Sequence, residues 1–371
     1  MTSIQNFSQV FLGRFISGAL QAVFYIVFAI ILEPEAYGNI SYIISLAGVF
    51  SIIFRFGLNH SIVVCHAKNN FPLVKDLNTL LIIFTTIGSI ILLIFDIYAA
   101  LICFASSLFV MNIQNFIGQK NYKSYALIVI GKAVLHLILP LILYHFFDIE
   151  GILLGIIFTY FIFSIQFLKL TNFKISSFNS LKNNFKILAH NFGVDTSLNF
   201  VKYIDKVIIA PLFGFASLGI FQLNVQILYA LEIFPTALHS YLLSEESRGN
   251  NNRKIIVLSL LTSSLIVICG ILFLPHLVEE FFPKYSEGIF SLQILLLSLF
   301  PLTISSIFNA KLQAQESTKI GFSAIVRISS LVVLIVILGE YYGLVGLSLS
   351  VLLSSTLYMI SLVIIYYMKN R

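Results

Sequence analysis

Long apolar runs dominate this sequence, and they constrain its fold more than any other feature does. A helix needs about 20 apolar residues to cross the hydrocarbon core of a bilayer. Twelve runs approach or exceed that length, at residues 8–31, 38–59, 77–95, 97–117, 124–146, 151–169, 187–210, 217–241, 254–275, 288–310, 320–339 and 343–367. The weakest separation lies between the third and fourth runs, at Asp96 and its neighbours. Charged residues make up 10% of the chain, against about 25% in soluble domains, so the sequence predicts an all-α integral membrane protein.

Basic residues are distributed unevenly among the loops that join these runs. If the N-terminus is cytoplasmic, fifteen Lys and Arg residues lie in the inside loops or at the termini, and one, Lys284, lies outside. Cytoplasmic loops of membrane proteins carry such an excess of basic residues. We therefore expect both termini in the cytoplasm. The net charge of +6 then reflects topology, and we expect no nucleic-acid partner.

Charged residues also occur inside the predicted spans, where each costs about 2.5–3.5 kcal/mol at the bilayer centre. Six are cations and three are acids: Arg14, Arg55, Lys132, Lys202, Lys206 and Arg327 against Asp195, Asp205 and Glu232. All of them are expected to face other protein or a hydrated cavity. Because the acids cannot neutralise all of the cations, the balance predicts a cavity that binds an anion.

The densest group of these charges lies between residues 195 and 206. Asp195, Asn199, Lys202 and Lys206 are spaced i, i+4, i+7 and i+11, so they share one face of a helix. This face is expected to line the cavity. A second interpretation stays open, in which the two lysines form fixed ion pairs with Asp195 or Asp205.

The other intramembrane cations also allow a structural interpretation. Arg14 and Arg55 lie near the predicted inside boundary, where a long side chain can extend to the lipid headgroups. Lys132 and Arg327 lie about two turns inside the predicted spans, so this explanation fits them less well. His136 follows Lys132 by one turn and is either a packed residue or a proton relay.

Two segments of the chain resemble each other. SSLFVMNIQNFIGQKNYKSYALIVIGK, ending at Lys132, parallels SSIFNAKLQAQESTKIGFSAIVR, ending at Arg327. A weaker parallel aligns Gly38 in EAYGNISY with Gly219 in SLGIFQLN. Six spans in each half would let both halves enter the membrane from the same side. The sequence thus predicts a parallel 6+6 repeat, with binding between the halves.

Several motifs also resemble a known family. ILEPEAYGNISYIISLAGVFSIIFRFGL is similar to the first-loop signature of polysaccharide exporters, and YIDKVIIAPLFGFASLGIFQLNVQ is similar to their second-half signature. FFPKYSEGIFSLQILLLSLF followed by LQAQESTK resembles their late pattern. Together they resemble the polysaccharide or O-antigen flippase branch of the multidrug/oligosaccharidyl-lipid/polysaccharide (MOP) exporter superfamily. Departures occur at Glu33, Phe221 and Glu316, where that family usually has Gly, Tyr and Gly.

This resemblance implies a fold and an activity. The fold is two six-helix lobes, residues 1–170 and 187–371, joined by a cytoplasmic linker at 171–186, around a central cationic cleft. The activity is transfer of an undecaprenyl-pyrophosphate-linked oligosaccharide across the bacterial cytoplasmic membrane by alternating access, coupled to an ion. Membrane lipids and other glycan-assembly proteins are the further partners that it implies.

Roles for individual residues follow from the resemblance and the charge balance together. Pyrophosphate binding is assigned to Arg14, Lys132, Lys202, Lys206 and Arg327, sugar contacts to Gln21, Asn199, Gln222 and Tyr229, and ion coupling to Asp195, Asp205 or Glu232. Arg offers a planar fork to phosphate oxygens, whereas Lys acts as a point charge.

Other function classes predict different sequence features. A drug or cation antiporter of the same superfamily shares the fold, but its cavity should be acidic. A membrane glycan polymerase needs a large outer loop, and the longest outside loop here spans about a dozen residues near 276–287. The sequence contains no Walker, GxSxG or HExxH motif. We therefore expect no enzymatic activity, no metal site and no cofactor.

Overall fold

The computed structural model describes residues 3–168, 188–189, 191–193, 195–196, 199–246, 253–315, 317 and 319–369, and these residues form helices and no strands. The chain divides into two compact units. Unit 1 comprises Met1–Tyr25 and Ile43–Tyr203, and unit 2 comprises Ile26–Tyr42 and Ile204–Arg371. The predicted linker at 171–186 lies outside the described residues, so the predicted boundary between two lobes stays a prediction.

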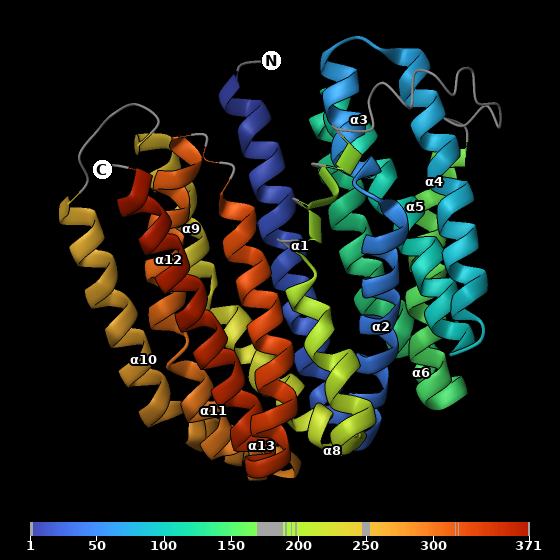
Figure 1. Ribbon diagram of the computed structural model, residues 1–371. Coiled ribbons are helices and arrows are strands. Elements are labelled where there is room, and N and C mark those ends of the chain that lie inside the picture. The colour runs from blue at the N-terminus through green and yellow to red at the C-terminus, as the bar shows by residue number, and fades with distance from the viewer. Residues whose placement is uncertain are drawn as a thin grey trace. The chain divides into compact units, whose positions relative to one another are not determined.

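Unit 1 is built from the helices of the first half of the chain (Figure 1). They are α1 (Ser3–Ile31), α2 (Pro34–Arg55), α3 (Leu58–Ala67), α4 (Phe71–Leu92), α5 (Ile97–Gly118) and α6 (Tyr122–Leu168), with the adjoining ends of α1 and α2 assigned to unit 2. Phe56 and Gly57 have positive φ angles of 45° and 71°, and they separate α2 from α3. Asp96 caps α5, since its Oδ1 accepts a hydrogen bond from the Ala99 amide at 2.7 Å. Asp96, which lies at the weakest separation between the predicted runs, therefore marks the start of a helix.

Unit 2 contains the remaining helices, and α10, α12 and α13 lie side by side within it (Figure 1). They are α8 (Val201–Leu231, in unit 2 from Ile204), α9 (Ile233–Glu246), α10 (Arg253–Phe281), the 3-10 helix η1 (Pro283–Gly288), α11 (Ile289–Leu296), α12 (Leu299–Ala314) and α13 (Ile320–Lys369). At one end of α12 and α13, Lys369 Nζ donates a hydrogen bond to the Gln315 carbonyl at 2.6 Å. Both residues were predicted on the inside.

The described residues contain nine helical segments long and apolar enough to cross a membrane. Three of them, Tyr122–Phe167, Val201–Leu243 and Ile320–Lys369, contain a residue with a non-helical backbone and are 43 to 50 residues long. Counting each of these three as two passes gives the twelve passes that the sequence predicts. The all-α membrane fold is therefore confirmed.

Helix α6 folds back on itself at Phe147 and Asp148, and α13 folds back at Gly343. Asp148 (φ 47°, ψ −134°) and Gly343 (φ 55°, ψ −133°) adopt nearly the same conformation. Three residues later, a Cβ on Gly151 would overlap the Leu143 carbonyl oxygen. Glycine is thus required where the returning helix crosses the outgoing one.

A close helix contact in unit 2 involves the two glycines that the sequence aligns. A Cβ on Gly38 would overlap the Phe215 carbonyl oxygen, and a Cβ on Gly219 would overlap the Pro34 carbonyl oxygen. Each glycine thus faces the residue four positions before the other. Nearby, Lys284 Nζ lies 2.8 Å from the Glu33 carboxylate. Both charges were predicted on the outside, and the structure places them together.

Candidate functional site

Lys132 is a buried cation in the first half of α6, with 6% of its surface exposed. Its Nζ lies 4.5 Å from the ring centroid of Tyr160, which comes from the returning half of the same helix. No carboxylate contacts it among the described residues. A cation over an aromatic face is attracted by the ring quadrupole, by about 2 kcal/mol when desolvated. Within the described part of the chain, the Lys132 charge therefore has an aromatic partner and no neutralising one.

His136 lies one turn after Lys132 and is 3% exposed. Its ring centroid is 4.8 Å from that of Phe24 on α1 and 5.6 Å from that of Tyr160. Its Nδ1 is buried and has no hydrogen-bond partner among the described residues. An orphaned buried polar atom is uncommon in proteins and points to a bound water, ion or ligand. Lys132, His136, Tyr160 and Phe24 are called the α6 cation cluster below.

A second buried charge in unit 1 is neutralised. Arg55 Nη2 lies 3.4 Å from Asp195 Oδ2, and the two side chains are 9% and 1% exposed. Asn199 Nδ2 donates to Asp195 Oδ1 at 2.8 Å, and His60 Nε2 lies 3.7 Å from the same oxygen. Arg55 Nη1 also donates to Ser51 Oγ at 2.7 Å. Arg55 is therefore a partner of Asp195, and its extension to the headgroups, one of the two interpretations of the sequence, does not occur.

In unit 2, helix α8 carries an ion pair near the kink at Gly214. Lys206 Nζ lies 3.0 Å from Asp205 Oδ1 and 3.1 Å from Asp205 Oδ2, and both residues are buried. The same Nζ lies 5.9 Å from the ring centroid of Tyr229, in the second half of the helix. Of the two interpretations of Lys206, the geometry favours the ion pair. Gln222, on the second half of α8, is 1% exposed.

Arg327 lies in the first half of α13 and is half-buried. Its guanidinium carbon is 5.3 Å from the ring centroid of Tyr358, in the returning half. The Tyr358 hydroxyl accepts a hydrogen bond from Asn309 Nδ2 at 3.2 Å, and Asn309 Oδ1 accepts one from Gln313 Nε2 at 3.2 Å. Arg327 thus rests on a tyrosine that α12 holds in place.

The remaining predicted residues lie outside these clusters. Arg14 is exposed, and its Nε donates to the Tyr125 hydroxyl at 3.2 Å. Lys202 is exposed, whereas Gln21 and Glu232 are half-buried. The structure does not bring all of the predicted cations together within one unit.

Sequence reasoning missed three contributors to these clusters: the role of Arg55, and the tyrosines at 160 and 358. The tyrosines give no signal of their own in a chain with 17 tyrosines. They become visible once the reversal points of α6 and α13 fix which residues face Lys132 and Arg327. Arg55 and Asp195 are 140 residues apart, so no local spacing connects them.

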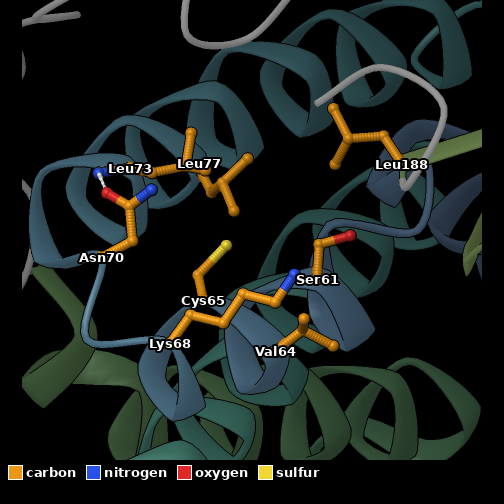
Figure 2. A pocket seen from close by; sticks show the side chains of 8 residues that line it. All are labelled: Ser61, Val64, Cys65, Lys68, Asn70, Leu73, Leu77 and Leu188. Carbon is orange, nitrogen blue, oxygen red and sulfur yellow. Dashed lines mark hydrogen bonds between the residues drawn. The ribbon is translucent and has the colours of Figure 1, made fainter. Parts of the chain in front are cut away.

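A small cavity in unit 1 contains none of the predicted residues. Its volume is about 30 Å³, and Figure 2 shows the residues that line it. They are Ser61, Val64, Cys65, Lys68, Asn70, Leu73, Leu77 and Leu188. Asn70 is the cap of α4, and its Oδ1 accepts a hydrogen bond from the Leu73 amide at 3.3 Å. The space suits about one water molecule and is much smaller than a cargo site.

Comparison with known proteins gives a family match and a fold. Residues 3–147 match the family model of polysaccharide biosynthesis proteins. An uncharacterised membrane protein of Methanocaldococcus jannaschii is 25% identical over 393 residues, which cover 93% of each chain.

Two kinds of solved structure are similar to this chain. The lipid II flippase MurJ, in an inward closed conformation, is 16% identical with a TM-score of 0.76, over 96% of this chain and 86% of MurJ. An inward-facing multidrug resistance MATE transporter of the MOP superfamily is 13% identical with a TM-score of 0.68, over 97% and 98% of the two chains. The fold is therefore that of MOP transporters. The family match over residues 3–147 and this fold agree with the resemblance to polysaccharide exporters of the MOP superfamily noted in the sequence.

Proposed function

We propose that this multi-pass membrane protein, which has the fold of the MOP transporters, is a flippase for a lipid-linked oligosaccharide. The cargo would be an undecaprenyl-pyrophosphate-linked repeat unit of the O-antigen or capsule type, moved across a bacterial cytoplasmic membrane by alternating access. Both termini would lie in the cytoplasm. The match to polysaccharide biosynthesis proteins and the similarity to a lipid II flippase support a glycan-bearing lipid as cargo.

One observation carries the proposal, namely which buried charges lack a counter-charge. The acids Asp195 and Asp205 each contact a cation, at 3.4 Å and 3.0 Å. Lys132 and Arg327 instead rest on tyrosine rings, with no carboxylate in contact among the described residues. A buried charge is stable when it is paired. The unit that buries Lys132 therefore favours an anionic ligand, and a pyrophosphate group supplies that charge.

Roles for the other predicted residues are part of this proposal. Gln222 and Tyr229 on α8 are proposed to contact sugars, together with Gln21 and Asn199. Arg14, Lys202 and Lys206 are proposed to add positive charge for the pyrophosphate. Lys206 is the weakest of these, since Asp205 already occupies its ammonium group. These assignments fit the generic polar contacts that oligosaccharides make.

Ion coupling was assigned to Asp195, Asp205 or Glu232. An opposite charge in contact favours the charged form of a carboxyl group, so a paired acid is a poor site for loading and releasing a proton. Asp195 and Asp205 are both paired in this way. Asp195 is better suited to fixing Arg55, and Asp205 to fixing its neighbour Lys206, which leaves the coupling step to Glu232 or to another group.

The second candidate function is a drug or cation antiporter, which the MATE-like fold also allows. A cation carrier needs a buried acid that is available to its cargo. The pairing of Asp195 with Arg55 and of Asp205 with Lys206 argues against this for two of the three predicted acids. The sign of the unmatched charge therefore separates the two functions.

A transport assay with purified protein in liposomes tests the proposal. The cargo is a polyprenyl-pyrophosphate oligosaccharide with a fluorescent sugar, and a membrane-impermeant quencher reports the leaflet that it occupies. We expect rapid loss of the protected fraction with protein present. A glycolipid with the same tail and sugar but no phosphate is the matched control and should stay protected.

A fluorescent cationic dye, assayed in the same liposomes, tests the antiporter. Dye movement without movement of the pyrophosphate lipid would contradict the flippase proposal. Equal movement of the phosphate-free glycolipid would show that the anion is not what the protein recognises.

A further inference from the structure

We propose that Lys132 carries the proton that couples transport, with His136 as the group that accepts it. Lys132 is charged while an anionic group of the cargo is bound against it, and it gives up a proton when that group leaves. This inference rests on the proposed function, because it requires an anionic cargo. It transfers ion coupling from the carboxylates to an amine.

The geometry of the α6 cation cluster suits such a role. Lys132 is buried with Tyr160 beneath its ammonium group at 4.5 Å. Without a bound anion, no carboxylate among the described residues offsets its charge. Burial without a counter-charge disfavours the charged form of an amine, and a lysine, unlike an arginine, can become neutral inside a protein. A bound phosphate reverses that preference, so binding of the anion and binding of the proton support each other.

His136 provides a route for the proton. It is one helical turn from Lys132, and its Nδ1 has no hydrogen-bond partner among the described residues. The neutral ring holds a proton on one nitrogen and accepts one on the other. When the anion leaves, an N–H bond of the Lys132 ammonium breaks, and the proton passes by way of water to form an N–H bond on the imidazole. The imidazolium then releases a proton to water, and no oxidant or further reactant is needed.

Among the residues that the structure describes, the groups around this cluster do not supply a competing acid. From α1 come Phe24, in contact with His136, and the neighbouring Tyr25. From α5 comes the amide of Asn112, which donates to the Phe163 carbonyl at 2.9 Å. The remaining titratable neighbours are Tyr160 and Tyr125 on α6, Arg14 on α1, Arg55 on α2 and Tyr203 at the start of α8.

Among these neighbours, Tyr160 and Tyr203 lie within electrostatic reach of Arg55. Tyr203 also lies within reach of Asp195. Asp195 itself is paired, since Arg55 lies 3.4 Å from its carboxylate. The charge state of Lys132 therefore depends mainly on whether an anion is bound at the α6 cation cluster.

The other two kinked helices show why Lys132 is the candidate. Each carries a cation over a tyrosine, Lys206 over Tyr229 in α8 and Arg327 over Tyr358 in α13. Lys206 has Asp205 in contact at 3.0 Å, and Arg327 cannot lose its proton. Of the three cations, Lys132 alone combines an ionisable amine with the lack of a carboxylate contact among the described residues.

Proton uptake on anion binding tests the inference. Inorganic pyrophosphate is titrated calorimetrically into the full-length protein in detergent, in two buffers with different ionisation enthalpies, across alkaline pH. Comparison with Lys132→Arg removes the titration of pyrophosphate itself. We expect wild type to take up about one proton more than K132R, and its affinity to fall up to about tenfold per pH unit relative to K132R.

Two controls keep the result specific to Lys132. Lys311→Arg changes a lysine that also lies over aromatic rings, at 5.5 Å and 5.9 Å, but has Glu246 at 4.0 Å, so it should behave as wild type. Lys132→Met replaces the amine by an uncharged side chain of similar length, and serves where K132R fails to fold. It should bind pyrophosphate more weakly, with no proton linked to this site.

His136→Gln separates a proton acceptor from a packing residue. In stopped-flow experiments with a pH dye, H136Q should slow proton release at least tenfold after pyrophosphate dilution and leave the number of protons unchanged. An unchanged rate would overturn the role of His136. Equal proton uptake by wild type and K132R would overturn the role of Lys132 and leave the flippase proposal standing, whereas no pyrophosphate binding by either protein would count against the flippase itself.

Discussion

Helices α6 and α13 have the same backbone plan and different chemistry. Asp148 follows Lys132 by 16 residues, and Gly343 follows Arg327 by 16 residues. The two reversal points share φ and ψ to within about ten degrees. Gly151 and Gly346 come three residues after them, each in close contact with a carbonyl oxygen eight residues back, of Leu143 and Leu338. The similarity between two sequence segments thus extends past the two cations and through both helical hairpins.

The side chains on this shared frame differ in whether the cation can lose its charge. Lys132 lies in an apolar and aromatic cluster beside His136, whose Nδ1 has no hydrogen-bond partner among the described residues. Arg327 lies on Tyr358, whose hydroxyl is held by Asn309. Lysine can change its charge and arginine cannot. One half of the chain therefore carries a variable cation and the other a fixed one at equivalent places.

The largest expected effect comes from breaking the shared frame. Gly151→Ala and Gly346→Ala each place a methyl group against a carbonyl oxygen, so each should lower the free energy of unfolding by about 2–3 kcal/mol. The measurement is the apparent unfolding free energy in mixed micelles. Gly18→Ala and Gly321→Ala are the matched controls, since a Cβ there meets nothing within 4 Å. A large loss at one hairpin and none at the other would show that the frames are not equivalent.

The frame itself could be predicted from the sequence because helix length and charge placement specify it. The runs at 124–146 and 151–169 predict a reversal near Asp148, and those at 320–339 and 343–367 predict one near Gly343. The repeat ending at Lys132 and Arg327 indicated where the equivalent cations lie. These features depend on local composition, which a single sequence displays directly.

The partners of the charges could not be predicted in the same way. Tyr160 faces Lys132 because of the antiparallel register of α6, which a shift of one turn would change. Arg55 and Asp195 are 140 residues apart in the sequence. The pattern around Arg55 fits a side chain that extends to the headgroups as well as one that faces other protein, so the sequence could not decide between them. Gly38 and Gly219 were aligned as equivalents, but their mutual contact required the packing of two helix starts. Pairing depends on tertiary packing, so periodicity alone leaves it open.

The second effect sharpens the contrast between the two cations. Lys132→Gln should reduce transport of the pyrophosphate lipid by about 10- to 100-fold, because a hydrogen bond to a charged group contributes about 1.5–3 kcal/mol. Arg327→Gln should cost less, since Arg327 is half-buried and more accessible to water. Initial rates in the quencher assay measure both, with protein amounts matched. A greater loss for R327Q than for K132Q would reverse the ranking of the two sites.

The third effect concerns the two reversal residues, Asp148 in α6 and Gly343 in α13. Asp148 has φ 47°, a conformation that glycine adopts freely and an L-residue adopts with strain of about 1–3 kcal/mol. Asp148→Gly should therefore stabilise the protein by about 1 kcal/mol, and Gly343→Asp should destabilise it by a similar amount. A Cβ on Gly343 meets nothing within 4 Å, so the cost there comes from the backbone. Changes of the same sign in both variants would contradict a common reversal geometry.

The smallest effect separates the two tyrosines. Tyr358→Phe removes the acceptor of the Asn309 amide and should lower the unfolding free energy by about 1 kcal/mol, as expected for one hydrogen bond. Tyr160→Phe keeps the ring under Lys132, and no hydrogen bond of the Tyr160 hydroxyl is found among the described residues, so its effect should be smaller. Unfolding in mixed micelles measures both, and Asn309→Ala combined with Y358F should cost little more than either change alone. If Y160F were the more damaging variant, the Lys132 ammonium would depend on that hydroxyl as well as on the ring, and the α6 cation cluster would be as fixed as its counterpart in α13.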